Sequence, residues 1–355
     1  MKSIYAAAAC MIFAAALSGC SDKKNNQSGK KAGEAIISPR TFTFEWQEPY
    51  KAKLDEFRNS ADYQESNGVA GSMFDIRDLN SDGIPELIIS PSADTDDDVR
   101  CTIYTYSGES VAEIGEIGSK GFFTFYPDTN IITNEFQGSG FVMGEFKRIT
   151  GTEFQTEMTY YNNMDSVESG AVLRYEIDKK EVYLAEYNEK ICAYTEQPSV
   201  IAGRRFTFGD SAVDHAIYCS EGWIAAASSD IKSLYKNKIK ELSGEYSSAA
   251  FDLMDMNGDE RPELIFSEGT SVEDSCRIFV YRDGELIECS EKCGVNGRFG
   301  FDIEKLVFFT INPQTVDQYG SLTDISLEGY EKSDSLMECG RKYIVSDDTI
   351  ATVFD

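Results

Sequence analysis

Oxygen-bearing side chains recur at one spacing in two segments of this chain. Each segment places Asp, Asn, Asp and Glu at positions 1, 3, 5 and 9. The residues are Asp78, Asn80, Asp82 and Glu86 in segment 78–86, and Asp255, Asn257, Asp259 and Glu263 in segment 255–263. Alternate residues of a tightly curved loop can point to one centre, and Ca²⁺ prefers about six to eight oxygen ligands of this hard type. The spacing therefore predicts two calcium sites.

The residues between these side chains suit a loop that folds over an ion. Gly83, at position 6, allows the left-handed backbone that a sharp turn requires, and Ile84, at position 7, offers its carbonyl oxygen. In the second segment Glu260 replaces the glycine, at a cost of about 1 kcal/mol if the left-handed conformation is kept. The alternative to a metal site is an acidic turn, because Asp and Asn side chains readily accept hydrogen bonds from nearby backbone N–H groups.

Both segments depart from a true EF-hand, which has a bidentate Glu at position 12 and continues as a helix. Here position 12 is Ile89, at the end of an apolar run, and Pro85 interrupts any helix. The segments instead resemble the EF-hand-like calcium loops of FG-GAP and VCBS-type repeats, in which the loop joins two strands. The resemblance covers about 15 to 35 residues of each copy. It implies that the eight side chains are calcium ligands, together with the carbonyl groups of Ile84 and Arg261.

The similarity between the two halves of the chain extends beyond these segments. Four pairs of segments align: 74–90 with 251–267, 101–106 with 276–281, 123–125 with 299–301, and 175–177 with 343–345. Similarity over this length indicates an internal duplication. The sequence therefore predicts two homologous repeat units, 41–205 with the calcium loop 78–86 and 206–355 with the calcium loop 255–263.

Each unit is predicted to begin with an amphipathic helix. The apolar stripes are Trp46, Tyr50, Leu54 and Phe57 in the first helix, and Ile224, Ala227, Ile231, Leu234, Tyr235, Ile239 and Leu242 in the second. Short alternating segments and turn residues then predict sequential antiparallel strands, with further short helices at 184–193 and 349–355. The predicted fold is mainly β, of the α+β type, with a helix and an antiparallel β-meander in each tandem repeat. A closed, propeller-like sheet and separate open sheets both satisfy the pattern.

The N-terminal sequence is typical of an export signal. Residues 4–17 are uncharged and mostly apolar, and this run is shorter than the roughly 20 apolar residues of a spanning helix. It ends in LSGC at 17–20, which resembles the lipobox of bacterial lipoproteins and implies a lipid on Cys20. We therefore predict a signal peptide at 1–19, then the lipidated cysteine and a flexible tether at 20–40, and a location on the extracytoplasmic side of a membrane. An ordinary signal peptide with a chance cysteine is the alternative.

Composition narrows the classes of partner. The formal net charge is −28, which disfavours a nucleic-acid-binding protein because such proteins need a basic surface. No second apolar stretch is long enough to cross a membrane as a helix. Seven cysteines follow Cys20, an odd number that does not suit a disulfide framework. Cys289 and Cys293 could pair across a turn, but most of these thiols are expected to behave as small buried hydrophobes.

Signals for catalysis are weak. The single histidine, His215, lacks the flanking glycines of a nucleophile elbow, and Ser233 with Lys236 matches S-x-x-K without a K-T-G partner. These residues are better explained as a packed or surface histidine and as helix surface. A glycosidase needs only two carboxylates, and 61 acidic residues offer many candidates without singling out a pair.

Two further groups have competing interpretations. Trp46 and Trp223 could stack on sugars, but their place in the helical stripes favours core positions. A second set of acidic residues could add metal ligands, although solvated loops explain them more simply. Its members are Asp94, Asp96, Asp97 and Asp98 in the first unit, and Glu273 and Asp274 in the second.

The sequence as a whole resembles the uncharacterised calcium-loop lipoproteins of gut-type bacteria, a group without an established activity. It favours a lipid-anchored, extracytoplasmic protein with two structural Ca²⁺ ions and a binding, adhesion or scaffolding role at the cell envelope. Its partner would be an extracellular glycan or protein. An envelope hydrolase acting on polysaccharide and a calcium-responsive sensor are the alternatives.

Overall fold

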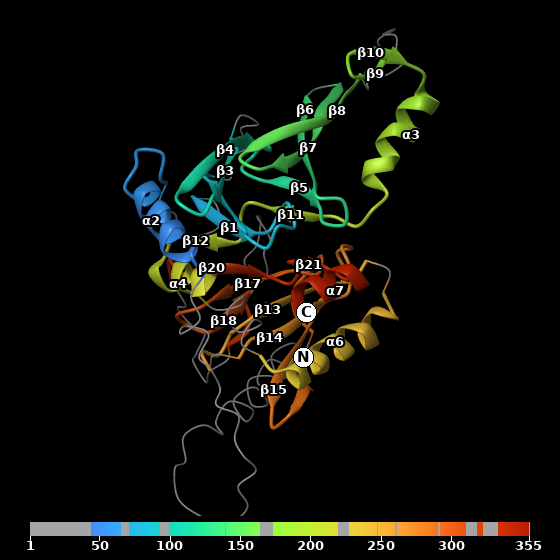
Figure 1. Ribbon diagram of the computed structural model, residues 1–355. Coiled ribbons are helices and arrows are strands. Elements are labelled where there is room, and N and C mark those ends of the chain that lie inside the picture. The colour runs from blue at the N-terminus through green and yellow to red at the C-terminus, as the bar shows by residue number, and fades with distance from the viewer. Residues whose placement is uncertain are drawn as a thin grey trace, which may run out of the picture. The chain divides into compact units, whose positions relative to one another are not determined.

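The computed structural model describes residues 44–64, 71–92, 99–138, 140–163, 173–218, 227–246, 248–259, 261–289, 292–309, 318–321 and 333–354. Several sequence-based predictions fall outside the described residues: the signal peptide, Cys20 and tether, Asp94, Asp96, Asp97, Asp98, Cys219, Trp223 and Glu260. The described residues fall into two compact units, 45–208 and 209–355. Figure 1 shows the helices and strands of both units.

The unit 45–208 opens with helix α2 (Gln47–Arg58) and a first antiparallel sheet in the order β12-β1-β2-β3-β4. The strands of this sheet are β1 (Met73–Arg77), β2 (Glu86–Ser90), β3 (Cys101–Tyr106), β4 (Val111–Ile117) and β12 (Phe206–Thr207). All five residues of β1 and of β2 are buried, as expected for central strands covered on both faces. The segment 78–86 joins these two strands.

A second antiparallel sheet of the same unit has the order β11-β5-β6-β7-β8-β9-β10. Its strands are β5 (Phe123–Tyr126), β6 (Ile131–Gly138), β7 (Phe141–Thr150), β8 (Glu153–Asn163), β9 (Tyr175–Ile177), β10 (Lys180–Val182) and β11 (Val200–Ala202). Helix α3 (Leu184–Thr195) packs on one face of this sheet, where Tyr187 joins the core around Phe146 and Tyr160. The ring of Tyr194 stacks on that of Phe146 with 4.4 Å between the centroids.

The unit 209–355 repeats this plan. Its helices are α4 (Asp210–Tyr218), α6 (Ser229–Ser243) and α7 (Asp347–Phe354). One antiparallel group has the order β16-β15-β14-β13-β21, and a second has the order β19-β18-β17-β20. The strands are β13 (Ala250–Met254), β14 (Glu263–Ser267), β15 (Cys276–Arg282), β16 (Glu285–Glu288), β17 (Phe299–Asp302), β18 (Val307–Phe309), β19 (Gln318–Ser321), β20 (Leu336–Cys339) and β21 (Tyr343–Ile344).

The two units have equivalent strand orders. The run β12-β1-β2-β3-β4 corresponds to β21-β13-β14-β15-β16, and β11-β5-β6-β7 corresponds to β20-β17-β18-β19. The architecture confirms the predicted fold class, a mainly β structure of the α+β type with antiparallel meanders. Two details differ from the sequence-based expectation. Helix α4 was not anticipated. Helix α6 begins at Ser229, because the hydroxyl of Ser228 caps it by accepting from the N–H of Ile231 at 3.4 Å. No helix among the described residues is long and apolar enough to span a bilayer.

In each unit one tyrosine of the helix that precedes the first two central strands, α2 or α6, is bonded to the loop between those strands. The hydroxyl of Tyr50 donates to the carbonyl of Pro85 at 2.7 Å, and that of Tyr235 donates to the carbonyl of Pro262 at 2.8 Å. Both tyrosines are completely buried. Since an unpaired buried carbonyl is costly, these bonds fix the helix and the loop to each other in both units.

We expect Tyr50→Phe and Tyr235→Phe each to lower the free energy of unfolding by about 1–2 kcal/mol, because the proline carbonyl loses its buried partner. Urea unfolding followed by circular dichroism measures this change. Tyr183→Phe is the matched control, because Tyr183 is 87% exposed. Equal stability of the control and both variants would show that these bonds contribute nothing.

Candidate metal centres and surface groove

The loop between β1 and β2 is closed by hydrogen bonds from its own backbone to its acidic side chains. Asp78 accepts from the N–H of Ser81 at 2.7 Å and from that of Gly83 at 3.0 Å. Asp82 accepts from the N–H of Ile84 at 2.8 Å. Gly83 has a φ of +84°, the left-handed conformation predicted for position 6. These bonds hold the side chains at positions 1 and 5 on the inside of the turn.

Glu86 lies beneath this loop as the first residue of β2 and is fully buried. Its carboxylate accepts from the N–H of Leu79 at 2.7 Å. Burial, followed by the negative charges of Asp78 and Asp82, raises the pKa of Glu86 to about 8. Burial and the charge of Asp82 likewise raise the pKa of Asp78. The carboxylates therefore repel one another in an environment that disfavours their charge.

The amide of Asn80 lies between two of these carboxylates. Its nitrogen donates to Asp82 at 3.0 Å and to Glu86 at 3.2 Å, while its oxygen accepts from the N–H of Asp82 at 2.9 Å. The amide N–H groups supply the partial positive charge that the carboxylates need. This interaction is weaker than that of a divalent cation, because an amide carries no net charge.

The second loop, between β13 and β14, repeats the arrangement. Glu263, which is 2% exposed, accepts from the N–H of Met256 at 2.7 Å and from the amide of Asn257 at 2.8 Å. Asp259 accepts from the N–H of Arg261 at 2.9 Å. Burial and the charges of Asp255 and Asp259 raise the pKa of Glu263 well above its ordinary value. A carboxylate is thus buried under the same hydrogen bonds in both units.

The donor set of each loop fits Ca²⁺ in its chemistry: three carboxylates and an amide, all hard oxygen donors. Among the described residues, however, no three acidic, cysteine or histidine side chains converge closely enough to enclose a metal ion. In the first loop the carboxylate oxygens are instead bonded to backbone N–H groups and to the Asn80 amide. Binding an ion would therefore require the Asn80 amide to turn its oxygen inward.

Asn130 is a loop-binding residue that the sequence analysis missed. Its amide donates to the carbonyl of Asn80 at 3.1 Å and accepts from the hydroxyl of Ser81 at 3.0 Å. It lies in the turn between β5 and β6, 50 residues away, so no local spacing points to it. Leu306 occupies the equivalent turn of the other unit and shares its left-handed backbone, with φ of +55° at both residues. Leucine has no polar group to make such bonds, so this clamp belongs to the first loop.

Position 4 of each loop is also left-handed. Ser81 has a φ of +61° and Gly258 one of +74°. Glycine adopts this conformation without strain, so the second loop has its glycine at position 4, whereas the first has it at position 6. The turn at position 4 was not foreseen from the sequence.

The structure also locates the weaker candidates. His215 is buried in α4. Ser233 is exposed on α6, and Tyr235, which lies between Ser233 and Lys236 in the S-x-x-K match, is buried. Trp46 is 4% exposed and packs beside Tyr50 with 5.5 Å between ring centroids, so it is a core residue. Glu273 is an exposed residue, whereas Asp274 accepts from the N–H of Ser271 at 2.7 Å.

The cysteines within the described part of the chain are free thiols: Cys101, Cys192, Cys276, Cys289, Cys293 and Cys339. All of them except Cys192 are buried. Burial raises the pKa of Cys101 and of Cys289 to about 12. These thiols therefore stay protonated at neutral pH and pack as small hydrophobes.

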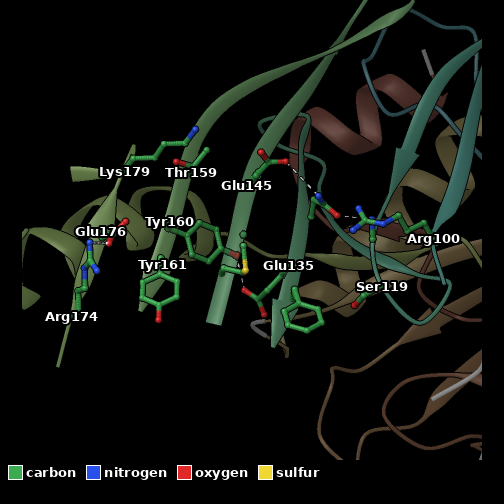
Figure 2. Close-up of a pocket in the computed structure, with 15 residues that line it drawn as sticks. Arg100, Ser119, Glu135, Glu145, Thr159, Tyr160, Tyr161, Arg174, Glu176 and Lys179 are labelled. Carbon is green, nitrogen blue, oxygen red and sulfur yellow. Dashed lines mark hydrogen bonds and ion pairs between the residues drawn. The ribbon is translucent and has the colours of Figure 1, made fainter. Parts of the chain in front are cut away.

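A groove of about 530 Å³ lies on the second sheet of the unit 45–208 (Figure 2). Most of its floor is formed by neighbouring residues of β6, β7, β8 and β9 on the face opposite the α3 core. Glu135, Gly144 and Tyr160, from the cross-strand row on the α3 side of the same strands, also line it. Two cross-strand rows run over this floor. The first begins with three apolar residues, Phe136, Met143 and Tyr161, and ends in Glu176. The second is polar and consists of Asn134, Glu145 and Thr159.

Charged residues line the groove in equal numbers of each sign. The bases are Arg100, Arg174 and Lys179, and the acids are Glu135, Glu145 and Glu176. Arg174 is paired with Glu176, and Glu145 is paired with Lys147 at 2.9 Å. The groove is therefore locally neutral in a chain of net charge −28. The sequence analysis did not find it, because its residues come together only through the pairing of four strands.

No protein-family model, curated protein or solved structure matches this chain significantly. Its function has to be inferred from the loops and the groove themselves.

In the absence of calcium we expect stability to fall as the pH rises from about 5 to 8. The pKa of Glu86 rises from an ordinary 4.5 to about 8 on folding, so between these values the folded state binds more protons than the unfolded state, and deprotonation favours unfolding. Glu263 acts in the same direction. Carboxylates with lowered pKa values, such as Glu145 and Glu288, act mainly below this window.

Urea titrations in EDTA at pH 5, 6, 7 and 8 measure this dependence. Glu86→Gln should reduce its slope, because the glutamine cannot titrate while Glu263 still does. Glu153→Gln at an exposed site should leave the slope unchanged. A midpoint that is constant, or that rises with pH, would contradict the inferred burial of both carboxylates.

Proposed function

We propose that this protein is a lipid-anchored, extracytoplasmic binding protein whose two units are each stabilised by one structural Ca²⁺ ion. The observation that carries the calcium proposal is the recurrence of one donor set in both units. In each loop a buried glutamate accepts from the N–H at position 2 at 2.7 Å and from the amide at position 3. A turn needing only side-chain-to-backbone bonds has no use for a buried carboxylate that two other acids repel.

Calcium would be held by the side chains at positions 1, 3, 5 and 9 and by the carbonyl at position 7. In the first loop these are Asp78, Asn80, Asp82, Glu86 and Ile84, and in the second they are Asp255, Asn257, Asp259, Glu263 and Arg261. The ion would neutralise the carboxylates and fix the connection between two central strands. Its role is therefore stabilisation of the fold, without a chemical step.

The anchor is supported by the LSGC sequence at 17–20 and the apolar run before it, as in lipoproteins cut before the cysteine. A binding role is supported by the position of the histidine and the serine that were weighed as catalytic residues from sequence motifs. His215 is buried in α4, and Ser233 lies on the outer surface of α6. The groove on β6–β9 offers a surface on which a ligand could lie.

Calcium at 1 mM should raise the thermal midpoint of the 21–355 chain relative to EDTA. Binding to the folded state alone stabilises by RT ln(1 + [L]/Kd), which is about 4 kcal/mol for a micromolar site at millimolar calcium. Asp78→Ala and Asp255→Ala should each remove part of this gain, because each disables one loop. Differential scanning calorimetry measures both effects.

Glu153→Ala, which removes an exposed acid outside both loops, is the control and should retain the full gain. Magnesium at the same concentration controls for general screening of the acidic chain. Midpoints that do not respond to calcium in any variant would leave both loops as acidic turns. A large change in the circular dichroism spectrum on chelation below the melting range would favour the calcium-sensor alternative.

A further inference from the structure

We propose that the groove on β6–β9 binds a neutral saccharide chain. This inference rests on the proposed binding role and names its ligand class and its site. A volume of about 530 Å³ lies within the range of small-ligand sites, roughly 300–1,000 Å³.

The two rows of the floor match the two kinds of surface that a sugar ring presents. Phe136, Met143 and Tyr161 lie side by side on β6, β7 and β8, and Met143 is 47% exposed. They form an apolar strip on which the C–H face of a pyranose can pack. The polar row lies two residues along each strand, about 7 Å away, where the hydroxyl groups at the rim of the ring would reach it.

The polar row contains both donors and acceptors. Asn134 has an amide, Thr159 has a hydroxyl, Glu145 has a carboxylate, and Arg100 and Lys179 at the margin donate only. A sugar hydroxyl both donates and accepts, so this mixture suits it. The balance of three acids and three bases gives no net attraction for a phosphate or a polyanion, and the acidic chain as a whole repels both.

The groove is organised before any ligand arrives. The ring of Phe141 lies against those of both Phe136 and Tyr161, with centroids 5.7 and 6.0 Å apart. The N–H of Gly118 donates to the Asn134 side chain at 3.0 Å, and the Asn134 amide donates to Glu145 at 3.4 Å. Side chains already held in place lose little entropy on binding.

The electrostatics of Glu145 do not suit the acid role in glycoside hydrolysis. A glycosidase requires a carboxylic acid whose pKa is raised, so that it is protonated when the bond breaks. Burial raises the pKa of Glu145, but the hydrogen bond and charge of Lys147, with Asn134 and Arg100, outweigh it and leave that pKa lowered. Glu145 is therefore an ionised acceptor at neutral pH.

The groove belongs to the unit 45–208. The segment between β5 and β11 covers residues 127–199, whereas its equivalent between β17 and β20 covers residues 303–335. The chain of the unit 45–208 is thus longer in the segment that contains the strands of the floor.

Affinity electrophoresis of the 21–355 chain tests this proposal in gels containing galactomannan, xyloglucan, arabinoxylan or amylopectin, with heparin and polygalacturonate as acidic comparators. We expect retardation by at least one neutral polysaccharide. Tyr161→Ala should weaken that binding at least tenfold, whereas Tyr183→Ala, at an exposed residue that does not line the groove, should leave it unchanged.

Met143→Glu is a second variant that removes no buried side chain and should also weaken binding at least tenfold, with an unchanged thermal midpoint. Retardation by none of the neutral polysaccharides, retardation by the acidic ones alone, or equal binding by Met143→Glu would each overturn the proposal. Release of reducing ends from the bound polysaccharide would show that the protein hydrolyses it, in place of the proposed binding role. Sugar binding without an effect of calcium on stability would support the saccharide proposal and contradict the calcium proposal. An effect of calcium without sugar binding would support the calcium proposal and contradict the saccharide proposal.

Discussion

A carboxylate buried at the start of the second strand is the constraint on which each unit depends. Glu86 and Glu263 lie in the protein interior, where an unpartnered charge is expensive, and each is bonded to the backbone and to the asparagine of its loop. These bonds define the path of the chain from the first central strand to the second. Helix α2 or α6 then bonds to the proline carbonyl that precedes the glutamate, through Tyr50 or Tyr235. Helix, loop and sheet are thus tied together around one buried acid.

A second set of buried polar contacts is preserved in both units. Asp75 accepts from the N–H of Gly203 at 3.4 Å, and Asp252 accepts from that of Gly340 at 3.2 Å. The arginine that follows each glycine donates to a buried serine of the second strand, Arg204 to Ser90 at 2.7 Å and Arg341 to Ser267 at 3.1 Å. Buried polar groups of this kind are costly to alter one at a time. The glycines are required as well, because a Cβ at Gly203 or Gly340 would lie 2.8 Å from the sulfur of Cys101 or Cys276.

The two units differ in the contacts around the first loop and in the second sheet. Asn130 clamps the first loop, whereas Leu306 stands at the equivalent position in the other unit. The strands β6–β8 are long and have an amphipathic outer face, and Gly144 lets the ring of Tyr160 cross β7 so that its hydroxyl reaches Glu135 at 2.6 Å. The core of each unit tolerates little change, whereas the peripheral sheet tolerates extension. A binding surface can arise in one copy from this arrangement.

Patterns along the chain were enough to predict the fold class, a helix before each pair of central strands, and the strand-joining character of both loops. These depend on local periodicity, on residues such as Gly83 and Pro85, and on similarity between two stretches of one chain. The signal peptide, Cys20 and the metal ligands remain predictions from motif. The burial of Glu86 and Glu263, the contact of Asn130 with the first loop across 50 residues, and the assembly of a groove from four strands became visible in the three-dimensional fold. Burial, long-range contacts and cross-strand rows depend on which strands become neighbours, and no spacing along the chain encodes that directly.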